Sequence, residues 1–276
     1  MKIAVLGLGI IGSRAAENLR LNSDHHVTLW NRTPKGFEGE CNDLLKAAGD
    51  AEVMALYLKD GPAVREVTTQ LFHSLSNKPT LLNHSTVDLA TTHWLAEECA
   101  KRGWGFLDAP FTGSRDAAAG AKLVYYAAGS SSLLEKMKPL LLETAKEVIP
   151  CGDVGRATII KLVTNLVSAC TVQALAEALA TATRHGIAPE TLTSAIASNA
   201  CGSPLAALKL PTMASGDFTP HFSLQNMLKD SRYALELAEG LDTPAIRTVS
   251  DRMAELCESG LSEQDFSCLA SPYLDS

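Results

Sequence analysis

Lys161 and Asn165 are the residues whose types and spacing most directly suggest catalysis. They lie four residues apart in the run G-R-A-T-I-I-K-L-V-T-N at positions 155–165, so in an α-helix both side chains would project from the same face. An ammonium can give a proton to an oxygen that gains negative charge, and an amide can orient that oxygen without adding charge. Apolar neighbours at Ile160 and Leu162 disfavour a charged ammonium, which eases the proton transfer. The pair could therefore serve the interconversion of a carbonyl and a hydroxyl group.

A second candidate site lies in the run D-A-P-F-T-G-S at positions 108–114. Proline and glycine favour a turn there, and Thr112, Gly113 and Ser114 would present two hydroxyls and a backbone N–H group. Several donors in one turn can bind an anion. We therefore expect these three residues to bind a carboxylate on the substrate.

The run G-L-G-I-I-G at positions 7–12 is a candidate phosphate-binding turn. A lone G-x-G-x-x-G is weak evidence, but here an apolar strand precedes it, a helix follows it, and a second strand ends about 20 residues later. The three glycines allow a tight turn, close approach of the backbone to a pyrophosphate, and close packing of the helix on the strand. The phosphates would then face the positive end of the helix. The expected contacts are Gly7, Leu8, Gly9, Ile10, Ile11 and Gly12.

The end of the second strand, Asn31-Arg32-Thr33, bears on which dinucleotide binds. NAD sites usually carry an acidic residue there, which accepts from the ribose 2′-hydroxyl. With Asn31 in that place no carboxylate repels a 2′-phosphate, while Arg32 can pair with it and Thr33 can donate to it. Arg32 could also be an ordinary solvated arginine, but the missing acid favours NADPH. Leu58 and Val64 complete the expected cofactor contacts.

These segments need a scaffold in which strands alternate with helices. In the first half, β-branched runs predict strands at residues 2–6, 26–30, 53–58, 80–82, 105–107 and 123–128. Helical patterns between them cover residues 12–21, 62–72, 89–102 and 132–143. The alternation predicts an α/β fold, a doubly wound Rossmann domain with a mainly parallel sheet.

The second half of the chain has no convincing strand. A long Ala- and Leu-rich stretch, 158–185, contains neither proline nor glycine and is followed by Gly186, which predicts a long interdomain helix. Further helical patterns cover residues 189–198, 205–214, 224–237 and 245–259. We therefore expect an NADP-binding Rossmann domain at 1–158, followed by an all-α domain for substrate binding and dimerisation at 159–276.

Together these segments resemble the β-hydroxyacid dehydrogenase family over nearly the whole chain. Its members carry a Gly-rich turn, a D-x-S-T segment, a D-A-P-x-S-G loop, a G-x-G-x-x-x-K-x-x-N-N run and a late K-D, in this order. The matching residues here are Thr86, Thr112-Gly113, Lys161 with Asn165, and Phe222 followed by Lys229-Asp230. The resemblance implies that Thr86 lies near the nicotinamide ribose, that Phe222 lines the substrate pocket, and that Lys229 closes on the cofactor.

Within the family, the serine that follows glycine in F-T-G-S-R is more similar to the glyoxylate/succinic semialdehyde reductase branch than to the hydroxyisobutyrate branch. The resemblance implies an NADPH-dependent reductase of a small aldehyde acid, with Lys161 as general acid. The chain departs from the family pattern at Asn83 (usually Asp), Thr112 (Ser), Ala157 (Gly) and Thr164 (Asn). The stretch between Pro34 and Glu52 is also short where relatives carry a helix and a strand, and it would wall the adenine pocket.

Four alternatives stay open at this point. Lys161 could be a surface lysine, the usual fate of lysine, although its spacing to Gly155 and Asn165 favours a catalytic role. The same scaffold serves imine reductases, which generally replace the catalytic lysine. It also serves catalytically silent dinucleotide-binding modules, which tend to lose it. His84 could touch the cofactor, but solvated or core histidines are commoner.

The composition excludes several other classes. Of 276 residues 46% are hydrophobic and 20% charged, and the net charge is −7 with no basic run, which argues against nucleic-acid and anionic-membrane partners. No stretch is expected to be long and apolar enough to span a membrane. The seven cysteines lie far apart without metal-ligand spacing, so we expect reduced thiols in a cytoplasmic protein and no metal site. Alanine-rich helices favour a homodimer or homotetramer that acts on a small molecule.

Overall fold

The computed structural model describes residues 1–21 and 25–274, and these fall into two compact units that divide between Lys161 and Leu162. The first unit is α/β and the second is helical, which confirms the predicted fold class.

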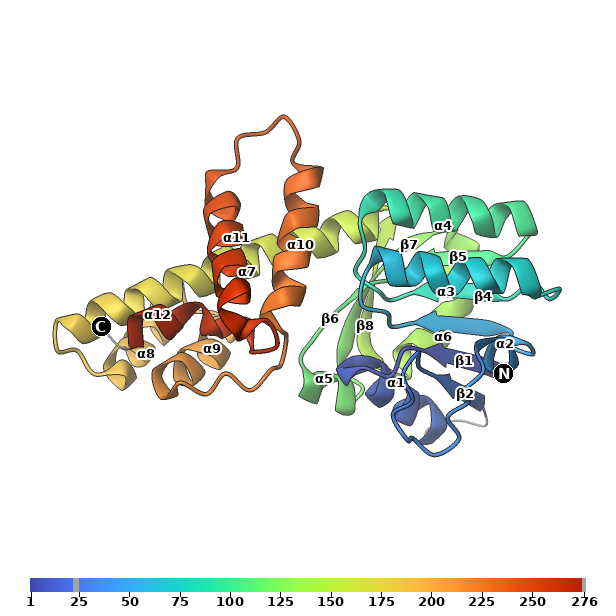
Figure 1. The fold of residues 1–276 in the computed structure, drawn as a ribbon, viewed down its shortest axis with the longest axis horizontal. Helices are drawn as coiled ribbons and strands as arrows, with labels where there is room; N and C mark the ends of the chain where they lie inside the picture. The colour runs from blue at the N-terminus through green and yellow to red at the C-terminus, as the bar shows by residue number, and fades with distance from the viewer. Residues whose placement is uncertain (22–24, 275–276) are drawn as a thin grey trace. The chain divides into compact units, whose positions relative to one another are not determined.

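A sheet of eight strands forms the centre of the first unit (Figure 1). The strands are β1 (Lys2–Leu6), β2 (His26–Trp30), β3 (Val53–Leu56), β4 (Thr80–Asn83), β5 (Gly105–Asp108), β6 (Phe111–Thr112), β7 (Leu123–Gly129) and β8 (Ala145–Gly152). Their order is β2-β1-β3-β4-β5-β7-β6, with β8 against β7. The first five strands run parallel, whereas β7 is antiparallel to β5 and β6. Because β2 and β3 lie on opposite sides of β1, the direction of winding switches at the carboxyl end of β1, where such folds bind ligands.

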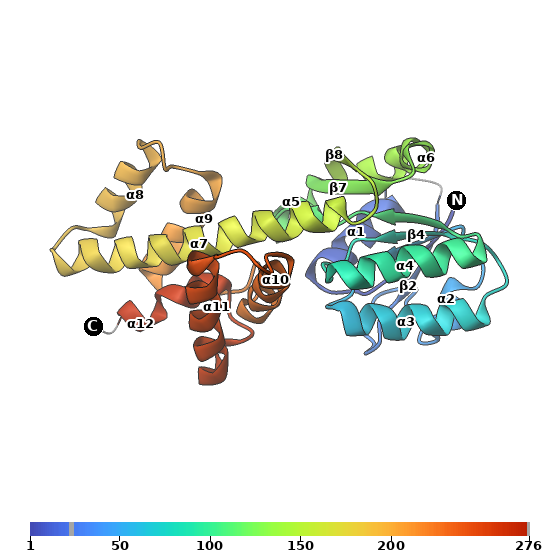
Figure 2. The same ribbon diagram turned by 90° about the horizontal axis from the view of Figure 1, so that it is seen from above.

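Helices cover both faces of this sheet (Figure 2). They are α1 (Ile10–Leu21), α2 (Leu44–Ala48), α3 (Gly61–Ser74), α4 (Leu89–Arg102), α5 (Arg115–Ala119) and α6 (Ser131–Leu142). Along β1, Ile3 and Val5 pack with residues of α1, α5 and α6, whereas Ala4 and Leu6 pack with residues of α2, α3 and α4. This alternation explains why the strands are apolar without interruption, since both of their faces are buried.

The second unit is a helical bundle around the C-terminal part of α7 (Arg156–Arg184) (Figure 1). The remaining elements are α8 (Pro189–Ala197), α9 (Pro204–Ser215), α10 (Leu224–Leu237), α11 (Pro244–Leu256), a π-helical turn (Cys257–Leu261), a 3-10 helix (Phe266–Ala270) and α12 (Ser271–Leu274). Leu and Met side chains of α7, α9, α10 and α11 form its core together with the 3-10 helix.

Helix α7 corrects one expectation from the sequence. It has 29 residues, and its most apolar 18-residue window has a mean hydropathy of 1.5, so one stretch is long and apolar enough to cross a membrane. Of that window 39% is buried in the structure, and α7 also buries the polar side chains of Lys161, Asn165 and Gln173. The core helices of water-soluble proteins have the same length and apolarity, so this single helix is weak evidence for a membrane span.

The sequence patterns missed four elements of the first unit, namely the short α2, α5 and β6 and the eight-residue strand β8. Strand β8 lies outside the main path of the sheet, pairs with β7, and contains Pro150, so it lacks the apolar pattern of a central strand. Helix α2 has five residues and begins at the cap Asp43, which accepts from the backbone N–H groups of Leu45 and Lys46. It lies in the short stretch between Pro34 and Glu52, which also holds a single β-bridge from Glu40 to Leu29.

Candidate active site

The glycine turn between β1 and α1 has the shape that a pyrophosphate needs. Gly7 has a φ of +107°, and a side chain there would overlap the carbonyl oxygen of Tyr57. A side chain at Gly12 would overlap the carbonyl oxygen of Gly7 and the Tyr57 side chain, so these two glycines are required for packing. A Cβ at Gly9, in contrast, would meet no atom within 4 Å. Open space at the middle glycine, at a helix N-terminus, is what the approach of a phosphate requires.

Asn31, which follows β2, braces this turn. Its Oδ1 accepts from the Leu8 N–H at 2.9 Å, and its Nδ2 donates to the Thr33 carbonyl at 2.6 Å. The Arg32 side chain is 72% exposed, and its Nη1 lies 3.4 Å from a carboxylate oxygen of Glu66 on α3. Arg32 is therefore accessible to a ligand apart from its contact with Glu66, whereas both polar atoms of the Asn31 side chain are already bonded within the loop.

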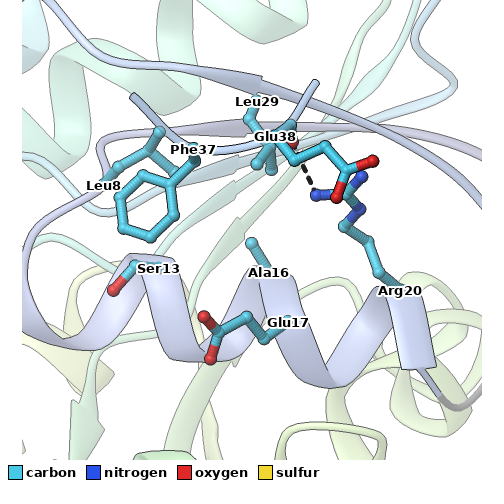
Figure 3. A pocket seen from close by; sticks show the side chains of 8 residues that line it. All are labelled: Leu8, Ser13, Ala16, Glu17, Arg20, Leu29, Phe37 and Glu38. Atoms are coloured by element: carbon cyan, nitrogen blue, oxygen red, sulfur yellow. Dashed lines mark hydrogen bonds between the residues drawn. The ribbon is translucent and has the colours of Figure 1, made fainter. Parts of the chain in front are cut away.

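A pocket of about 230 Å³ lies beside the turn, between α1 and the loop that follows β2 (Figure 3). Its lining residues are Leu8, Ser13, Ala16, Glu17, Arg20, Leu29, Phe37 and Glu38. Glu40 orders this loop because its carboxylate accepts from the N–H groups of Lys35 and Phe37, and Arg20 donates to the Glu38 carbonyl at 2.8 Å. Two carboxylates at the pocket make it a poor site for a phosphate.

Four aromatic side chains meet at the carboxyl ends of the central strands. His84 stacks on Tyr57, with ring centroids 4.7 Å apart, and lies 4.6 Å from the ring centroid of Tyr125. Phe111 is 6.0 Å from Tyr57 and 6.5 Å from Tyr125. The Nζ of Lys161 lies 6.0 Å from the centre of the Phe111 ring. The first turns of α7 thus bring Lys161 to the edge of an aromatic cluster.

His84 is neutral at physiological pH. Burial lowers its pKa to about 4, and the hydrogen bond from Nδ1 to the Ala109 carbonyl, 2.7 Å long, only partly opposes this. Because Nδ1 must donate to that carbonyl, the hydrogen of the neutral ring is on Nδ1 and Nε2 is an acceptor. The alternatives for His84 are therefore a core residue and a neutral contact to a ligand, and a cationic role is excluded.

A directed chain of hydroxyl groups supports the aromatic cluster. Thr144 donates to the Leu141 carbonyl, so its oxygen accepts from Tyr125 at 2.9 Å, and Tyr125 accepts in turn from Tyr57 at 2.7 Å. Burial raises the pKa of both tyrosines, so both stay protonated. The chain fixes the two rings and leaves the Tyr57 oxygen as an acceptor.

Lys161 and Asn165 are both 8% exposed and lie one helical turn apart on α7. Within the second unit, the Asn165 Nδ2 donates to Oδ2 of Asp230 at 2.6 Å, and Asp230 is 1% exposed. The Nζ of Lys229 lies 3.0 Å from the other carboxylate oxygen. The buried carboxylate of Asp230 therefore orients both the Asn165 amide and the Lys229 ammonium.

The Thr112-Gly113-Ser114 loop begins with the last residue of β6, and Gly113 at its tip is exposed. Gly113 has a φ of +143°, and a Cβ there would lie 2.8 Å from a methyl group of Leu123. Ser114 caps α5, because its Oγ accepts from the Ala117 N–H at 3.2 Å. That bond uses a lone pair and leaves the hydroxyl hydrogen available for donation.

The other expected contact residues have different surroundings. Leu58 is half-buried beside Gly7, and its N–H donates to the Ser85 hydroxyl. Thr86 is half-buried after β4. Val64 is 0% exposed and belongs to the core, so its side chain is not presented to a ligand. Phe222 lies in the second unit, where it packs edge-on against Phe266.

Sequence patterns gave no role to Tyr57, Tyr125, Asp108 or Asp230. Tyr57 directly follows β3 and Tyr125 lies within β7, 68 residues further along the chain, so no local spacing relates them. Asp108 begins the run D-A-P-F-T-G-S, and Asp230 directly follows Lys229. Their places in these motifs were the signal that could have identified them.

Comparison with known proteins covers nearly the whole chain. The sequence family described as the NAD binding domain of 6-phosphogluconate dehydrogenase matches residues 2–152. The family described as NAD-binding of NADP-dependent 3-hydroxyisobutyrate dehydrogenase matches residues 155–273. Both units thus have counterparts in nicotinamide-dependent dehydrogenases.

Individual proteins agree with these families. The chain is 29% identical over 98% of its length to glyoxylate/succinic semialdehyde reductase 2, chloroplastic, of Arabidopsis thaliana, and covers 78% of that protein. It is 27% identical to glyoxylate/succinic semialdehyde reductase 1 of the same plant, with 98% of this chain and 97% of that protein covered. A solved structure of Mycobacterium tuberculosis 3-hydroxyisobutyrate dehydrogenase with L-serine is 25% identical, with a TM-score of 0.88 and 99% of each chain covered.

Proposed function

Because the chain belongs to the β-hydroxyacid dehydrogenase family and is an NAD(P)-dependent oxidoreductase acting on CH–OH groups, we propose that it interconverts a small aldehyde acid and its hydroxy acid. The aldehyde acid would be of the glyoxylate or succinic semialdehyde type, and NADPH would be the cofactor. The observation that carries this proposal is the buried Lys161 ammonium beside Phe111, on a helix that also carries Asn165.

The glycine turn fits a dinucleotide, because Gly9, unlike Gly7 and Gly12 in the same turn, has open space where a side chain would stand. The backbone of Gly7–Gly12 would hold the pyrophosphate at the N-terminus of α1. When bound, the nicotinamide supplies a hydride to the carbonyl carbon of the substrate.

Lys161 would give its proton to the oxygen of the reduced carbonyl. An ammonium held at the substrate carbonyl can give its proton to an oxygen that gains negative charge. Asn165 would fix that oxygen, since one of its N–H groups is held by Asp230 and the rest of its amide is oriented by this bond. The two residues thus divide proton transfer and orientation between them.

The loop Thr112-Gly113-Ser114 would bind the substrate carboxylate. We expect catalytic efficiency, kcat/KM, to be at least tenfold higher for succinic semialdehyde than for butanal, which lacks only the carboxylate, because a hydrogen bond to a charged group contributes roughly 1.5–3 kcal/mol. Ser114→Ala should reduce this preference. The matched control is Ser203→Ala, which removes the same kind of cap from α9 in the second unit. Equal efficiencies for the acid and for butanal would show that the loop does not bind a carboxylate.

Cofactor preference is expected to depend on Arg32. Arg32→Ala should weaken NADPH binding by roughly tenfold or more, the effect of losing one charge-assisted hydrogen bond, and leave NADH binding nearly unchanged. Glu66→Gln removes the carboxylate that faces Arg32 and should keep or strengthen NADPH binding. Fluorescence titration with both cofactors measures these affinities. Equal losses for NADPH and NADH in Arg32→Ala would contradict the assignment.

We also place the protein in the cytoplasm as a homodimer or homotetramer. All seven cysteines are free thiols, two of them buried at Cys99 and Cys268, which suits a reducing compartment. Burial raises the pKa of both of these thiols to about 12, so neither is a reactive thiolate.

A further inference from the structure

The carboxylate of Asp108 is buried at the end of β5, against the first turn of α7. Asp108 is 0% exposed and accepts three hydrogen bonds, from the N–H of Gly155 at 3.2 Å, the N–H of Thr158 at 2.9 Å and the hydroxyl of Thr158 at 2.8 Å. The first N–H groups of a helix have no partner within the helix, and a carboxylate there also meets the positive end of the helix dipole. Asp108 therefore caps α7 from a strand that precedes it by 47 residues.

This cap joins the two segments to which catalysis has been assigned. Lys161 stands three residues after Thr158 on α7, and Phe111 stands three residues after Asp108 at the start of the Thr112–Ser114 loop. We propose that Asp108 is a positioning residue that holds the Lys161 ammonium in register with Phe111 and the carboxylate-binding loop. The inference rests on the role given to Lys161 under the proposed function.

All hydrogen bonds around Asp108 are donated toward its carboxylate. Thr158 has a single hydroxyl hydrogen, which goes to Asp108, so its oxygen accepts from Thr92 on α4 at 2.9 Å. The chain from Thr92 through Thr158 ends on an ionised carboxylate, which accepts every bond that reaches it. A protonated Asp108 carries a hydrogen of its own and no charge, so the charge-assisted bonds to the first turn of α7 are lost.

Protonation of Asp108 falls within an accessible pH range. Burial raises its pKa to about 6, against the opposing effects of the bonds from Thr158 and Gly155 and of nearby His93. His93 on α4 and Cys151 on β8 are the titratable groups whose charge interacts with Asp108, while on α7 Arg156 pairs with Asp153 and Lys161 carries the proposed proton. We therefore expect turnover to fall on the acid side with a midpoint near pH 6.

Turnover should fall as the pH is lowered, but the contribution of Asp108 to folding stability should rise. The pKa of Asp108 is higher in the folded protein than in the unfolded chain, so its contribution to stability is fully present below about pH 4 and is lost as the pH rises through about 6. Above pH 6 the ionised carboxylate thus orders the helix at a cost in stability. A merely structural cap would lower stability when it is removed, whereas Asp108→Asn should leave thermal stability at pH 7.5 unchanged or raised.

The test compares Asp108→Asn with the unaltered chain on glyoxylate and succinic semialdehyde with NADPH. We expect kcat to fall about tenfold, the KM for NADPH to stay within twofold, and the decline of kcat near pH 6 to disappear. Asp43→Asn, a change of the same kind at the cap of α2, should leave kcat unchanged. Thr158→Val removes one bond but keeps the charge, so it should lower kcat less and retain the acid decline.

Three outcomes would overturn the inference. The first is a kcat within twofold of wild type in Asp108→Asn. The second is an unchanged acid decline in that variant, and the third is the loss of the decline in His93→Gln instead. Lys161→Ala is measured in parallel, so that the two proposals can be separated. If Lys161→Ala loses turnover while Asp108→Asn does not, only the role of Asp108 fails, whereas an active Lys161→Ala removes the proposed function as well.

Discussion

Replacing Lys161 by alanine is expected to lower turnover by about 100-fold or more, the usual scale for the loss of a general acid. The side chain is 8% exposed, so the loss would arise at a buried site beside Phe111 and not from a change of surface charge. The turn Gly7–Gly12 is untouched, so NADPH should still bind. Steady-state kinetics and fluorescence titration measure the two effects separately.

One further variant separates proton donation from positive charge, and a second is a surface control. Lys161→Arg keeps a cation that does not release its proton at physiological pH, so it should be nearly as inactive as the alanine variant. Lys136→Ala removes an exposed lysine from α6 and should leave turnover unchanged. Full activity in Lys161→Ala would return this lysine to a purely structural role.

Replacing Lys209 by methionine is expected to destabilise the second unit by about 3–5 kcal/mol, the cost of leaving one member of a buried ion pair without its partner. The Lys209 Nζ lies 2.6 Å from Asp265, and their side chains are 3% and 2% exposed. Asp265 also accepts from the N–H groups of His221, Phe222 and Ser267. The unpaired charge of Asp265 would destabilise the segment at His221 and Phe222. This segment leads into α10, the helix that carries Lys229.

Urea unfolding followed by circular dichroism measures this change, and a double variant tests its cause. Combining Lys209→Met with Asp265→Asn removes both charges and should recover part of the loss. Arg252→Met breaks an exposed ion pair on α11 and should cost less than about 1 kcal/mol. A loss below 1 kcal/mol in Lys209→Met would show that the buried pair contributes little.

The pH dependence of this pair follows from Asp265. Burial alone would raise the pKa of its carboxyl group, but the charge of Lys209 and the hydrogen bonds outweigh it, so the pKa is lowered overall. Its contribution to stability is therefore present above the unfolded pKa near 3.8 and is lost as the pH falls below it.

The sequence predicted the features that depend on residues near one another in the chain. The glycine turn, the apolar strands and the helical spacing of Lys161 and Asn165 are all local patterns, and the structure contains the turn, the strands and the helix. Strand β8 was not predicted, because it is an edge strand that contains Pro150 and shows no apolar alternation. The hydrogen bonds between Asp108 and Thr158 and between Tyr57 and Tyr125 were not predicted either, because they join residues that are 50 and 68 positions apart. Such partners are brought together by the order of the strands, which no local spacing encodes.

The burial of Asp108 also restricts how chains of this family can recombine. The two matching sequence families meet between residues 152 and 155, yet the donors that satisfy this carboxylate, Gly155 and Thr158, lie beyond that junction. A chimera joined there would take its aspartate from one parent and the helix start from the other. The two backbone N–H donors come with any parent that has no proline there, but the hydroxyl donor requires a parent with threonine or serine at position 158. A crossover after Lys161, in contrast, takes the carboxylate, its donors and the lysine from one parent. Exchange of whole second halves is therefore most tolerated inside α7, several residues past the point where the sheet ends.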